Sequence, residues 1–320
     1  MPLWVISADL GGTKIELGLV DPQDRIIARR RVLTGREASP TSVVEDIARC
    51  RDELERELPS GEHLAALGIC CPGPLDQAAG ILINPTNLPK MFNAPLRQLL
   101  ADRLRLPVQL EHDAKAAALG EFYYGAGRGL RSMAYIVVGT GIGAAFIVEG
   151  QLYRGQHDSA GEVGHTTLDA EGDVCVCGNR GCVQTFASGP FIAKRYQRAL
   201  AQAGRASEGD LAIPADAVAR LAAAGDPVAG RIMAEAGAAL GRAVATLAMI
   251  LDIEVYIIGG SVSRAGDLLL QPAREVVSRH MFQWMAERVR VVESPLGDDA
   301  PLLGCAWLAR QAAEVQSVNP

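Results

Sequence analysis

The stretch Leu3–Val20, LWVISADLGGTKIELGLV, contains two apolar runs joined by a Gly-Gly turn. The pattern predicts two antiparallel strands, and RIIARRRVL predicts a third strand after a proline-containing turn. Asp9 lies where the first strand meets the turn formed by Gly11, Gly12 and Thr13. Glycine turns expose N–H groups that can face phosphate oxygens, and an adjacent Asp can hold the accompanying metal. Taken alone, a Gly-Gly turn equally describes an ordinary hairpin, and the chain has no P-loop motif.

A second stretch, Met133–Val148 (MAYIVVGTGIGAAFIV), repeats this order of apolar strand, glycine turn and apolar strand. Its turn consists of Gly139, Thr140 and Gly141, and a shorter third strand is expected to follow. An internal repeat of this kind predicts two related α/β lobes, each offering a phosphate-binding hairpin to a shared central cleft.

A third glycine turn ends the apolar strand EVYIIGGSV at Gly259 and Gly260. An adenosine could lie against the bare backbone at such a turn. Three glycine turns in one chain favour a nucleotide-binding protein more strongly than any one of them does. The segment before this strand predicts a long Ala-rich helix at 226–251, and the segment after it predicts a helix at 263–288 that breaks at Pro272.

The composition narrows the class of protein. The 320 residues are 49% hydrophobic and carry a formal net charge of −6, which suits a large core and leaves no basic surface for nucleic acid. Aromatic residues make up only 5%, which argues against a stacking platform for single-stranded nucleic acid. We expect no apolar run long enough to span a bilayer and no secretory signal, and therefore no membrane partner and a cytoplasmic location.

The junction EHD at 111–113 separates a predicted strand, PVQLEH, from a predicted helix that runs from Ala114 to about Tyr124. A carboxylate at such a junction can be a helix N-cap. Because Asp113 lies in sequence between the two glycine hairpins, we favour a general base that accepts the proton of a substrate hydroxyl. Asn87, in the polar loop NPTNLP, could bind substrate hydroxyls or could simply form a turn.

The loop Glu162–Cys182, EVGHTTLDAEGDVCVCGNRGC, concentrates metal ligands. His165, Cys175, Cys177 and Cys182 are a sufficient set for a tetrahedral structural zinc ion, and the glycines of CxCGxxGC allow a tight turn. A disulfide or a group of unrelated buried thiols is the alternative. If zinc holds His165, it also fixes Glu162 nearby, and this pair could bind a polyhydroxy ligand.

Seven motifs together give the chain a resemblance to the ROK family of sugar kinases, repressors and uncharacterised proteins. The resemblance covers almost the whole chain, and the pairing of the GEVGH and CxCGxxGC motifs is highly specific. The motifs are DLGGTK (9–14), PGPLD (72–76), EHDAKAAALGE (111–121), GTGIG (139–143), AGEVGH (160–165), CVCGNRGC (175–182) and GGSV (259–262).

The resemblance implies the actin-like ATPase fold, which is ribonuclease H-like, with two α/β lobes; we expect residues 1–115 plus 303–320 in the smaller and 116–302 in the larger. It implies ATP and Mg2+ as well as structural Zn2+, with Asp113 as base. The implied sugar contacts are Gly73, Asn87, His112, Asp113, Glu162, His165 and Gln184, and the implied nucleotide contacts are Asp9, Gly11, Gly12, Thr13, Lys14, Gly139, Thr140, Gly141, Gly259 and Gly260.

Three residues depart from the usual family pattern. His112 and Lys115 stand where Asn is common, and Gln184 stands where a sugar-binding Glu is common. An amide at 184 can still donate to and accept from a hydroxyl but lacks the charge of a carboxylate. These changes leave the identity of the sugar open.

The sequence thus predicts an ATP-dependent hexose kinase, a phosphotransferase with an alcohol acceptor that phosphorylates glucose or an N-acetylhexosamine, at C6 by expectation. Polyphosphate is an alternative phosphoryl donor. The rival interpretations are a sugar-sensing regulator without kinase activity and an acetate-type or glycerol-type kinase. Repressors of the family carry a helix-turn-helix before the first hairpin, and the early position of Asp9 favours a kinase. The family resemblance also implies a homodimer.

Overall fold

The computed structural model describes residues 3–204 and 213–318. The loop that the sequence suggests at 203–211 therefore lies largely outside the described part. The described chain divides into two compact units. The first comprises the residues up to Arg128, the segment Arg154–Ala160 and the residues from Asp298 onward; the second comprises Gly129–Tyr153 and Gly161–Gly297. The whole of the helix that begins at Asp113 lies in the first of these compact units, and the lobe boundaries at 115/116 and 302/303 stay predictions.

The first unit is built on a five-stranded mixed sheet of order β3-β2-β1-β4-β7. β1 pairs antiparallel with β2 and parallel with β4, as the alternating apolar runs predict. Around it lie four helices, two short strands and a 3-10 turn. The elements are β1 (Trp4–Leu10), β2 (Lys14–Val20), β3 (Ile26–Leu33), α1 (Pro40–Glu55), β4 (Leu64–Cys71), β5 (Leu75–Asp76), β6 (Ile81–Leu82), η1 (Pro89–Met91), α2 (Leu96–Leu104), β7 (Val108–His112), α3 (Asp113–Tyr124) and α10 (Asp299–Val318).

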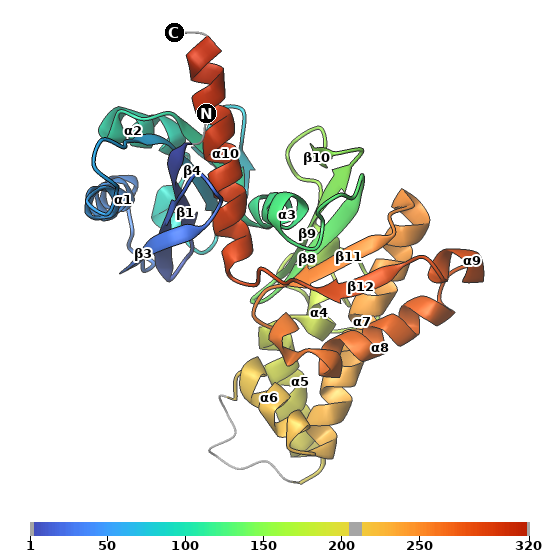
Figure 1. The fold of residues 1–320 in the computed structure, drawn as a ribbon. Helices are drawn as coiled ribbons and strands as arrows, with labels where there is room; N and C mark the ends of the chain where they lie inside the picture. The colour runs from blue at the N-terminus through green and yellow to red at the C-terminus, as the bar shows by residue number, and fades with distance from the viewer. Residues whose placement is uncertain (1–2, 205–212, 319–320) are drawn as a thin grey trace. The chain divides into compact units, whose positions relative to one another are not determined.

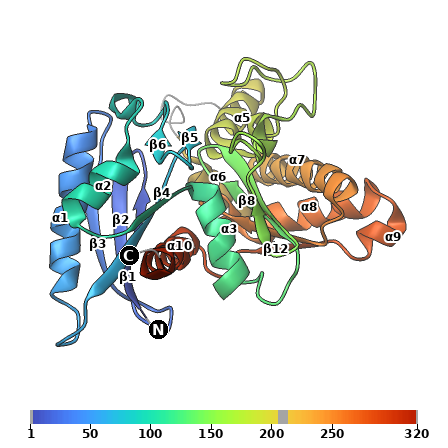
Figure 2. The same cartoon turned by 90° about the horizontal axis from the view of Figure 1, so that it is seen from above.

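Helices cover both faces of this sheet. Figure 2 shows α1 and α2 on one face and α3 and α10 on the other. The buried apolar side chains follow the same division: Ile6 and Ile47 belong to the cluster beneath α1, and Val5 and Ala306 belong to a second cluster beneath α10. Alternating strand residues therefore face two separate layers of the core, which explains the nearly continuous apolar runs.

The start of α1 follows from its cap. The Ser39 hydroxyl accepts a hydrogen bond from the Ser42 backbone N–H at 3.2 Å, and the Ser42 hydroxyl accepts one from the Ser39 backbone N–H at 2.9 Å. Pro40 occupies the first turn of the helix. The sequence Ser39–Pro40–Thr41 is a capping and start signal that predicts a helix over 41–58, and the structure confirms the start. The predicted helix after the EHD junction is likewise confirmed as α3.

The second unit repeats the sheet order of the first: β10-β9-β8-β11-β12, with β8 antiparallel to β9 and parallel to β11. The internal repeat predicted from the glycine turns is therefore present in the topology (Figure 1). The elements are β8 (Met133–Val138), β9 (Ile142–Val148), β10 (Gln151–Tyr153), η2 (Val163–His165), α4 (Gln184–Ala187), α5 (Gly189–Gln202), α6 (Ala215–Ala223), α7 (Pro227–Leu251), β11 (Val255–Gly259), η4 (Ser263–Ala265), α8 (Asp267–Arg279), α9 (Gln283–Ala286) and β12 (Arg290–Glu293).

The expected helix break at Pro272 is wrong. α8 runs through Pro272 and ends at Arg279. A proline inside a helix removes one backbone hydrogen bond and needs space for its ring. Here Pro272 packs against Gly237 of α7, where a Cβ would lie only 3.1 Å from the proline Cβ. Tertiary packing of α8 on a glycine of α7 therefore accommodates the proline.

The expectation that no apolar run could span a bilayer also needs correction, because α7 is long and apolar enough by length and composition. Half of its apolar window is buried within the structure, and Ala236, Leu240 and Val244 are among its buried residues. α7 packs with α8, and its buried side chains join those of β8 and β11 in one cluster. The helix is thus a core element of the second unit.

Candidate functional site

The first glycine turn is tightly built. The Gly11 N–H donates to the Lys14 carbonyl at 2.9 Å and closes the turn between β1 and β2. A Cβ at Gly12 would lie 2.8 Å from the Cβ of Asn87, so only glycine allows these two segments to approach so closely. The structure thereby brings Asn87 against the predicted phosphate turn. The Lys14 ammonium forms an ion pair with Glu16 at 2.7 Å.

Asp9, at the end of β1, lies near a second carboxylate. Burial and, next in size, the negative charge of Asp113 raise its pKa to about 6, although a hydrogen bond from the Cys70 thiol at 3.4 Å lowers it in part. Two carboxylates that repel each other in this way suit a cation. Oxygen ligands are those that Mg2+ prefers, so Asp9 fits the predicted magnesium position.

Asp113 is the first residue of α3, and His112 is the residue before the helix. The Asp113 carboxylate is not an N-cap: its Oδ1 accepts from the adjacent Ala114 N–H at 2.6 Å and lies 3.0 Å from His112 Nδ1. The side chain is 47% exposed, so its other oxygen can receive a proton from a ligand. This geometry fits a general base held by its neighbours.

His112 packs on the turn that contains Gly73. A Cβ at position 73 would lie 2.9 Å from the His112 Cδ2 atom, so the glycine makes room for the imidazole. The predicted sugar contacts Gly73 and His112 therefore lie together, beside Asp113. The ring's position also explains how histidine can stand where the family commonly has asparagine: the side chain has a polar atom facing Asp113 and a flat face against backbone.

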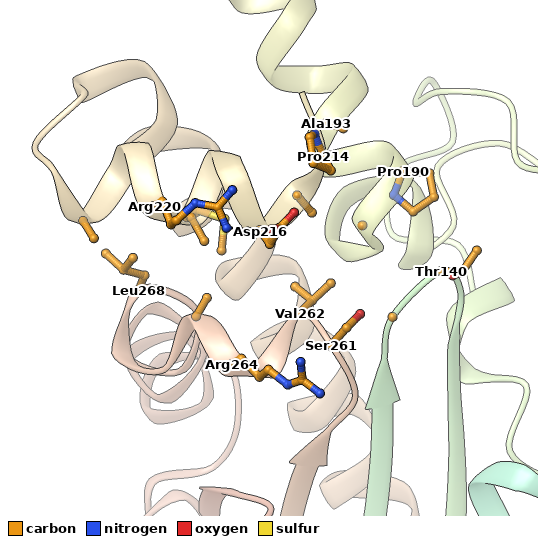
Figure 3. Close-up of a pocket in the computed structure, with 17 residues that line it drawn as sticks. Thr140, Pro190, Ala193, Pro214, Asp216, Arg220, Ser261, Val262, Arg264 and Leu268 are labelled. Carbon is orange, nitrogen blue, oxygen red and sulfur yellow. Dashed lines mark hydrogen bonds and ion pairs between the residues drawn. The ribbon is translucent and has the colours of Figure 1, made fainter. Parts of the chain in front are cut away.

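The second glycine hairpin borders a cavity of about 720 Å3 in the second unit (Figure 3). Gly139 and Thr140 of the β8–β9 turn line the cavity, and Figure 3 shows Thr140 on the same side as Ser261, the residue after Gly260. The start of α5, the length of α6 and the start of α8 provide mainly small apolar side chains. A cavity of this size and character suits a nucleoside, with a glycine turn placed for its phosphates.

The polar residues at this cavity were missed by sequence reasoning. Asp216 and Arg220, one turn apart on α6, form an ion pair at 2.7 Å at the cavity, and Arg264 of η4 also lines it (Figure 3). Charged residues in a helix are usually solvated, so nothing in the local pattern marks them. Only the packing of α6 opposite η4 brings them to one cavity.

The four predicted zinc ligands do converge. One ligand atom from each of the four residues lies within 4.8 Å of every other. The Cys177 and Cys182 sulfurs are 3.7 Å apart, and the Cys175 sulfur is 3.5 Å from His165 Nδ1. Zinc–sulfur bonds of about 2.3 Å and zinc–nitrogen bonds of about 2.0 Å would give a sulfur–sulfur edge of about 3.8 Å and a sulfur–nitrogen edge of about 3.5 Å in a tetrahedral site. The cluster could therefore hold a tetrahedral zinc ion, and its cysteines are free thiols rather than a disulfide.

His165 faces two groups at once. Its Nδ1 points to the cysteines, while its Nε2 lies 3.9 Å from the Glu162 carboxylate, whose side chain is exposed. A metal-bound histidine commonly places its second nitrogen against a carboxylate, which fixes the ring. Gln184, a predicted sugar contact, is buried and donates from Nε2 to the Cys175 sulfur at 3.2 Å. The loop therefore links the metal cluster to Glu162 and Gln184.

The predicted site residues divide between the two units. Asp113, Asp9, Asn87, His112 and the first glycine turn belong to the first unit. The zinc cluster, Glu162, Gln184 and the other two glycine turns belong to the second.

Comparison with known proteins identifies the family. A family model described as "ROK family" matches residues 5–312, which is nearly the whole chain. The chain belongs to the ROK family. The family resemblance seen in the seven motifs is thereby confirmed.

Three relatives illustrate the sequence and structural similarity of this chain to other members of the family. It is 36% identical over 318 residues to a glucokinase of Thermotoga maritima, covering 97% of this chain and 98% of the relative. It is 32% identical over 307 residues to a putative xylose repressor of a Caldicellulosiruptor species, covering 94% of this chain and 76% of the relative. The crystal structure of a ROK family glucokinase from Streptomyces griseus in complex with glucose and AMPPNP superposes with a TM-score of 0.82, at 32% identity, covering 96% of this chain and 99% of that one.

These findings confirm the fold class. The chain has the actin-like ATPase fold, and its two α/β units contain five-stranded sheets with the same strand order.

Proposed function

We propose that this ROK protein is an ATP-dependent sugar kinase that transfers the γ-phosphate of ATP to a hydroxyl of a hexose, with C6 as the acceptor position. Glucose and N-acetylhexosamines are the proposed acceptors. The reaction is a phosphoryl transfer to an alcohol, which requires mainly positioning and charge stabilisation from the protein.

One observation carries the proposal: Asp113 stands at the first position of α3 with a half-exposed carboxylate, and Asp9 lies close enough for the two charges to interact. In the proposed mechanism, Asp113 accepts the proton of the sugar hydroxyl as that hydroxyl attacks the γ-phosphate. His112 and the Ala114 N–H hold the carboxylate in place. Gly73 and Asn87 would contact the sugar from the same unit.

The phosphates would meet the two glycine hairpins. Gly11, Gly12 and Thr13 in the first unit and Gly139, Thr140 and Gly141 in the second would donate backbone N–H groups, with Lys14 close to the first turn. Bound near Asp9, Mg2+ would neutralise charge on the transferred phosphate. The adenosine would occupy the cavity of the second unit, against Gly259 and Gly260 and beside Ser261.

The zinc cluster would have a structural role. Bound to His165, Cys175, Cys177 and Cys182, Zn2+ would cross-link the loop and so stabilise its conformation. His165 and Glu162 would then face the sugar hydroxyls from a fixed loop. Gln184, tied to Cys175, would contribute an amide where a carboxylate is common in the family.

The decisive experiment is an ADP-release assay with magnesium and ATP against glucose, N-acetylglucosamine, mannose, N-acetylmannosamine, fructose and allose. Turnover with one sugar well above the rest is expected, and polyphosphate in place of ATP tests the donor. No turnover with any of these sugars, in protein shown to contain zinc and to bind ATP, would contradict the proposal.

A sugar-sensing regulator without kinase activity is the second candidate, favoured by the 32% identity to a putative xylose repressor. The two candidates differ in one measurement. A regulator binds sugar in isothermal titration calorimetry with no ADP release, whereas a kinase shows both. We further propose a cytoplasmic homodimer, to be checked by sedimentation, and lobe boundaries near 115/116 and 302/303, to be checked by limited proteolysis.

A further inference from the structure

The segment Arg154–Ala160 has an unusual place in the chain. The residues on both sides of it belong to the second unit, yet the segment itself belongs to the first. It closes on itself, because the Ala160 N–H donates to the Arg154 carbonyl at 3.0 Å. We call these seven residues the docking loop. Its C-terminal end leads directly through Gly161 to Glu162, a proposed sugar contact.

The docking loop is attached on both sides of the proposed base. Two residues before Asp113, the Glu111 carboxylate is 1% exposed and accepts from Arg154 Nε at 3.1 Å and from Arg154 Nη2 at 2.6 Å. Two residues after Asp113, the Lys115 side chain is buried and its ammonium donates to the Asp158 carbonyl. A third bond, from the Gln77 N–H to the Asp158 carboxylate at 3.3 Å, holds the far side of the loop.

Glu111 also touches the backbone next to the base. Its Oε1 accepts from the His112 N–H at 2.9 Å while its Oε2 receives Arg154. One buried carboxylate thus links the loop to the peptide that precedes Asp113. The Arg154 side chain is partly exposed, but the Glu111 carboxylate is buried, and leaving that charge unpaired inside the protein is costly, so the pair holds a fixed geometry.

We propose that the docking loop positions the general base, with Arg154 and Lys115 as its positioning residues. This inference rests on the proposed kinase function. The loop contains no group that needs to touch the reacting atoms. It would act by fixing the strand end and the first helical turn between which the base stands. A misplacement of about 1 Å at such a position can lower turnover by a factor of about 100.

The test uses Arg154→Met, Glu111→Gln and the double variant, with Lys115→Met as a second approach to the loop. Arg310→Met is the matched control. Arg310 is also a partly buried arginine in the first unit that pairs with a carboxylate, Asp24. It also donates to the Asp21 carbonyl in the β2–β3 turn and to the Tyr124 hydroxyl at the end of α3 farthest from Asp113. Each variant is assayed for kcat and for KM of sugar and ATP at a temperature where circular dichroism shows it folded.

Each of the Arg154→Met and Lys115→Met changes should lower kcat roughly 10- to 100-fold. The KM for ATP should stay within about twofold of wild type, and Arg310→Met should keep kcat within about twofold even if it lowers the melting temperature more. The kcat of the Arg154→Met/Glu111→Gln double variant should be no lower than that of the more impaired single variant, since both changes remove the same ion pair. Equal kcat in the Arg154 and Arg310 variants, or additive losses in the double variant, would overturn the proposal.

Hydrogen exchange separates this inference from the kinase proposal. Arg154→Met should speed amide exchange in residues 111–115, whereas Arg310→Met should not. This readout needs no turnover, so it decides the role of the loop even if wild type phosphorylates none of the sugars. Unchanged exchange at 111–115 in Arg154→Met would overturn the inference while leaving the kinase proposal intact.

Discussion

The two five-stranded sheets have the same strand order, but the residues at their strand ends differ in chemistry. In the first unit, β1 ends beside Asp9 and β7 leads into Asp113. In the second, β8 ends in Val138, and its glycine turn borders a cavity lined mainly by small apolar side chains. The same strand order thus carries the acid–base groups in the first unit and a nucleoside-sized cavity in the second. Topology provides positions, and the residues at those positions decide the chemistry.

The largest expected effect is on kcat and tests the carboxylates of the first unit. Asp113→Asn removes the proposed proton acceptor and retains the side-chain shape, so kcat should fall on the order of 100- to 10,000-fold with sugar affinity nearly unchanged. Turnover and sugar binding by calorimetry measure the two quantities. Asp102→Asn, an exposed carboxylate on α2, is the control. Full activity in the Asp113 variant would reject its assignment as base.

The next prediction concerns zinc. Among the described residues, the four proposed zinc ligands all belong to the second unit. Removal of zinc by a chelator should lower the melting temperature and abolish sugar turnover, because the loop that carries Glu162 and His165 would lose its cross-link. Elemental analysis should find one zinc per chain in wild type and much less in Cys177→Ser. Cys50→Ala, at a buried cysteine of α1, should keep its zinc. Normal sugar phosphorylation by metal-free protein would contradict the structural role.

A smaller effect is expected from filling the cavity of the second copy. Ala219 of α6 lines it, and Ala219→Phe should raise the KM for ATP about 10-fold or more while the KM for sugar stays within about twofold, because only the nucleoside loses space. Ala224→Phe, at the exposed end of the same helix, is the control. If the Ala219 variant instead raised the KM for sugar alone, the cavity would not be the nucleotide site.

The smallest expected effect concerns Asp21, a buried carboxylate of the first unit that we expect to contribute to folding stability and not to the reaction. Burial would raise the pKa of Asp21, but hydrogen bonds from the Arg25 and Gln23 N–H groups and from the Arg25 guanidinium outweigh burial and lower it. A lowered pKa stabilises the folded state above the unfolded pKa, and this stabilisation is lost as the pH falls through the folded value.

Asp21→Asn should therefore lower the free energy of unfolding by roughly 1–2 kcal/mol at pH 7 and by progressively less as the pH falls below about 4. Denaturant titration across this range measures the difference, with Asp52→Asn as the control, because Asp52 is a half-exposed carboxylate of α1 that also pairs with an arginine. Turnover should be unchanged. A difference that grows toward acid pH would show that the pKa of Asp21 is raised rather than lowered.

Much of the fold was predictable because its signals are local. Apolar runs ending at glycine turns marked β1, β2, β8 and β9, and Ser39 with Pro40 marked the start of α1. The signals failed where a distant contact overrides a local preference. Pro272 stays helical where Gly237 of another helix makes room for it, and α7 is long and apolar because half of its apolar window is buried in the core.

The candidate site divides in the same way. The cysteine cluster and Asp113 were recognisable, because a short spacing or a strand–helix junction puts the needed atoms together whatever the rest of the chain does. Arg154, Arg264 and Asp216 were not, because an isolated charged residue in a sequence describes a solvated surface equally well. The partner of Arg154, Glu111, lies 43 residues away in the sequence, and only folding brings Asp216 and Arg264 to the same cavity.

The sequence alone determined the family, the duplicated strand and glycine-turn pattern, and the set of metal ligands, since each depends on neighbours along the chain. The tertiary structure decided which carboxylates influence one another. Asp9 and Asp113 are far apart in sequence, yet the parallel strands β1 and β7, with β4 between them, bring them to one edge of a sheet, where burial and the charge of Asp113 raise the pKa of Asp9. It also decided that a loop flanked by the second unit docks around the base, because a buried charge such as Glu111 must find its partner wherever the fold provides one.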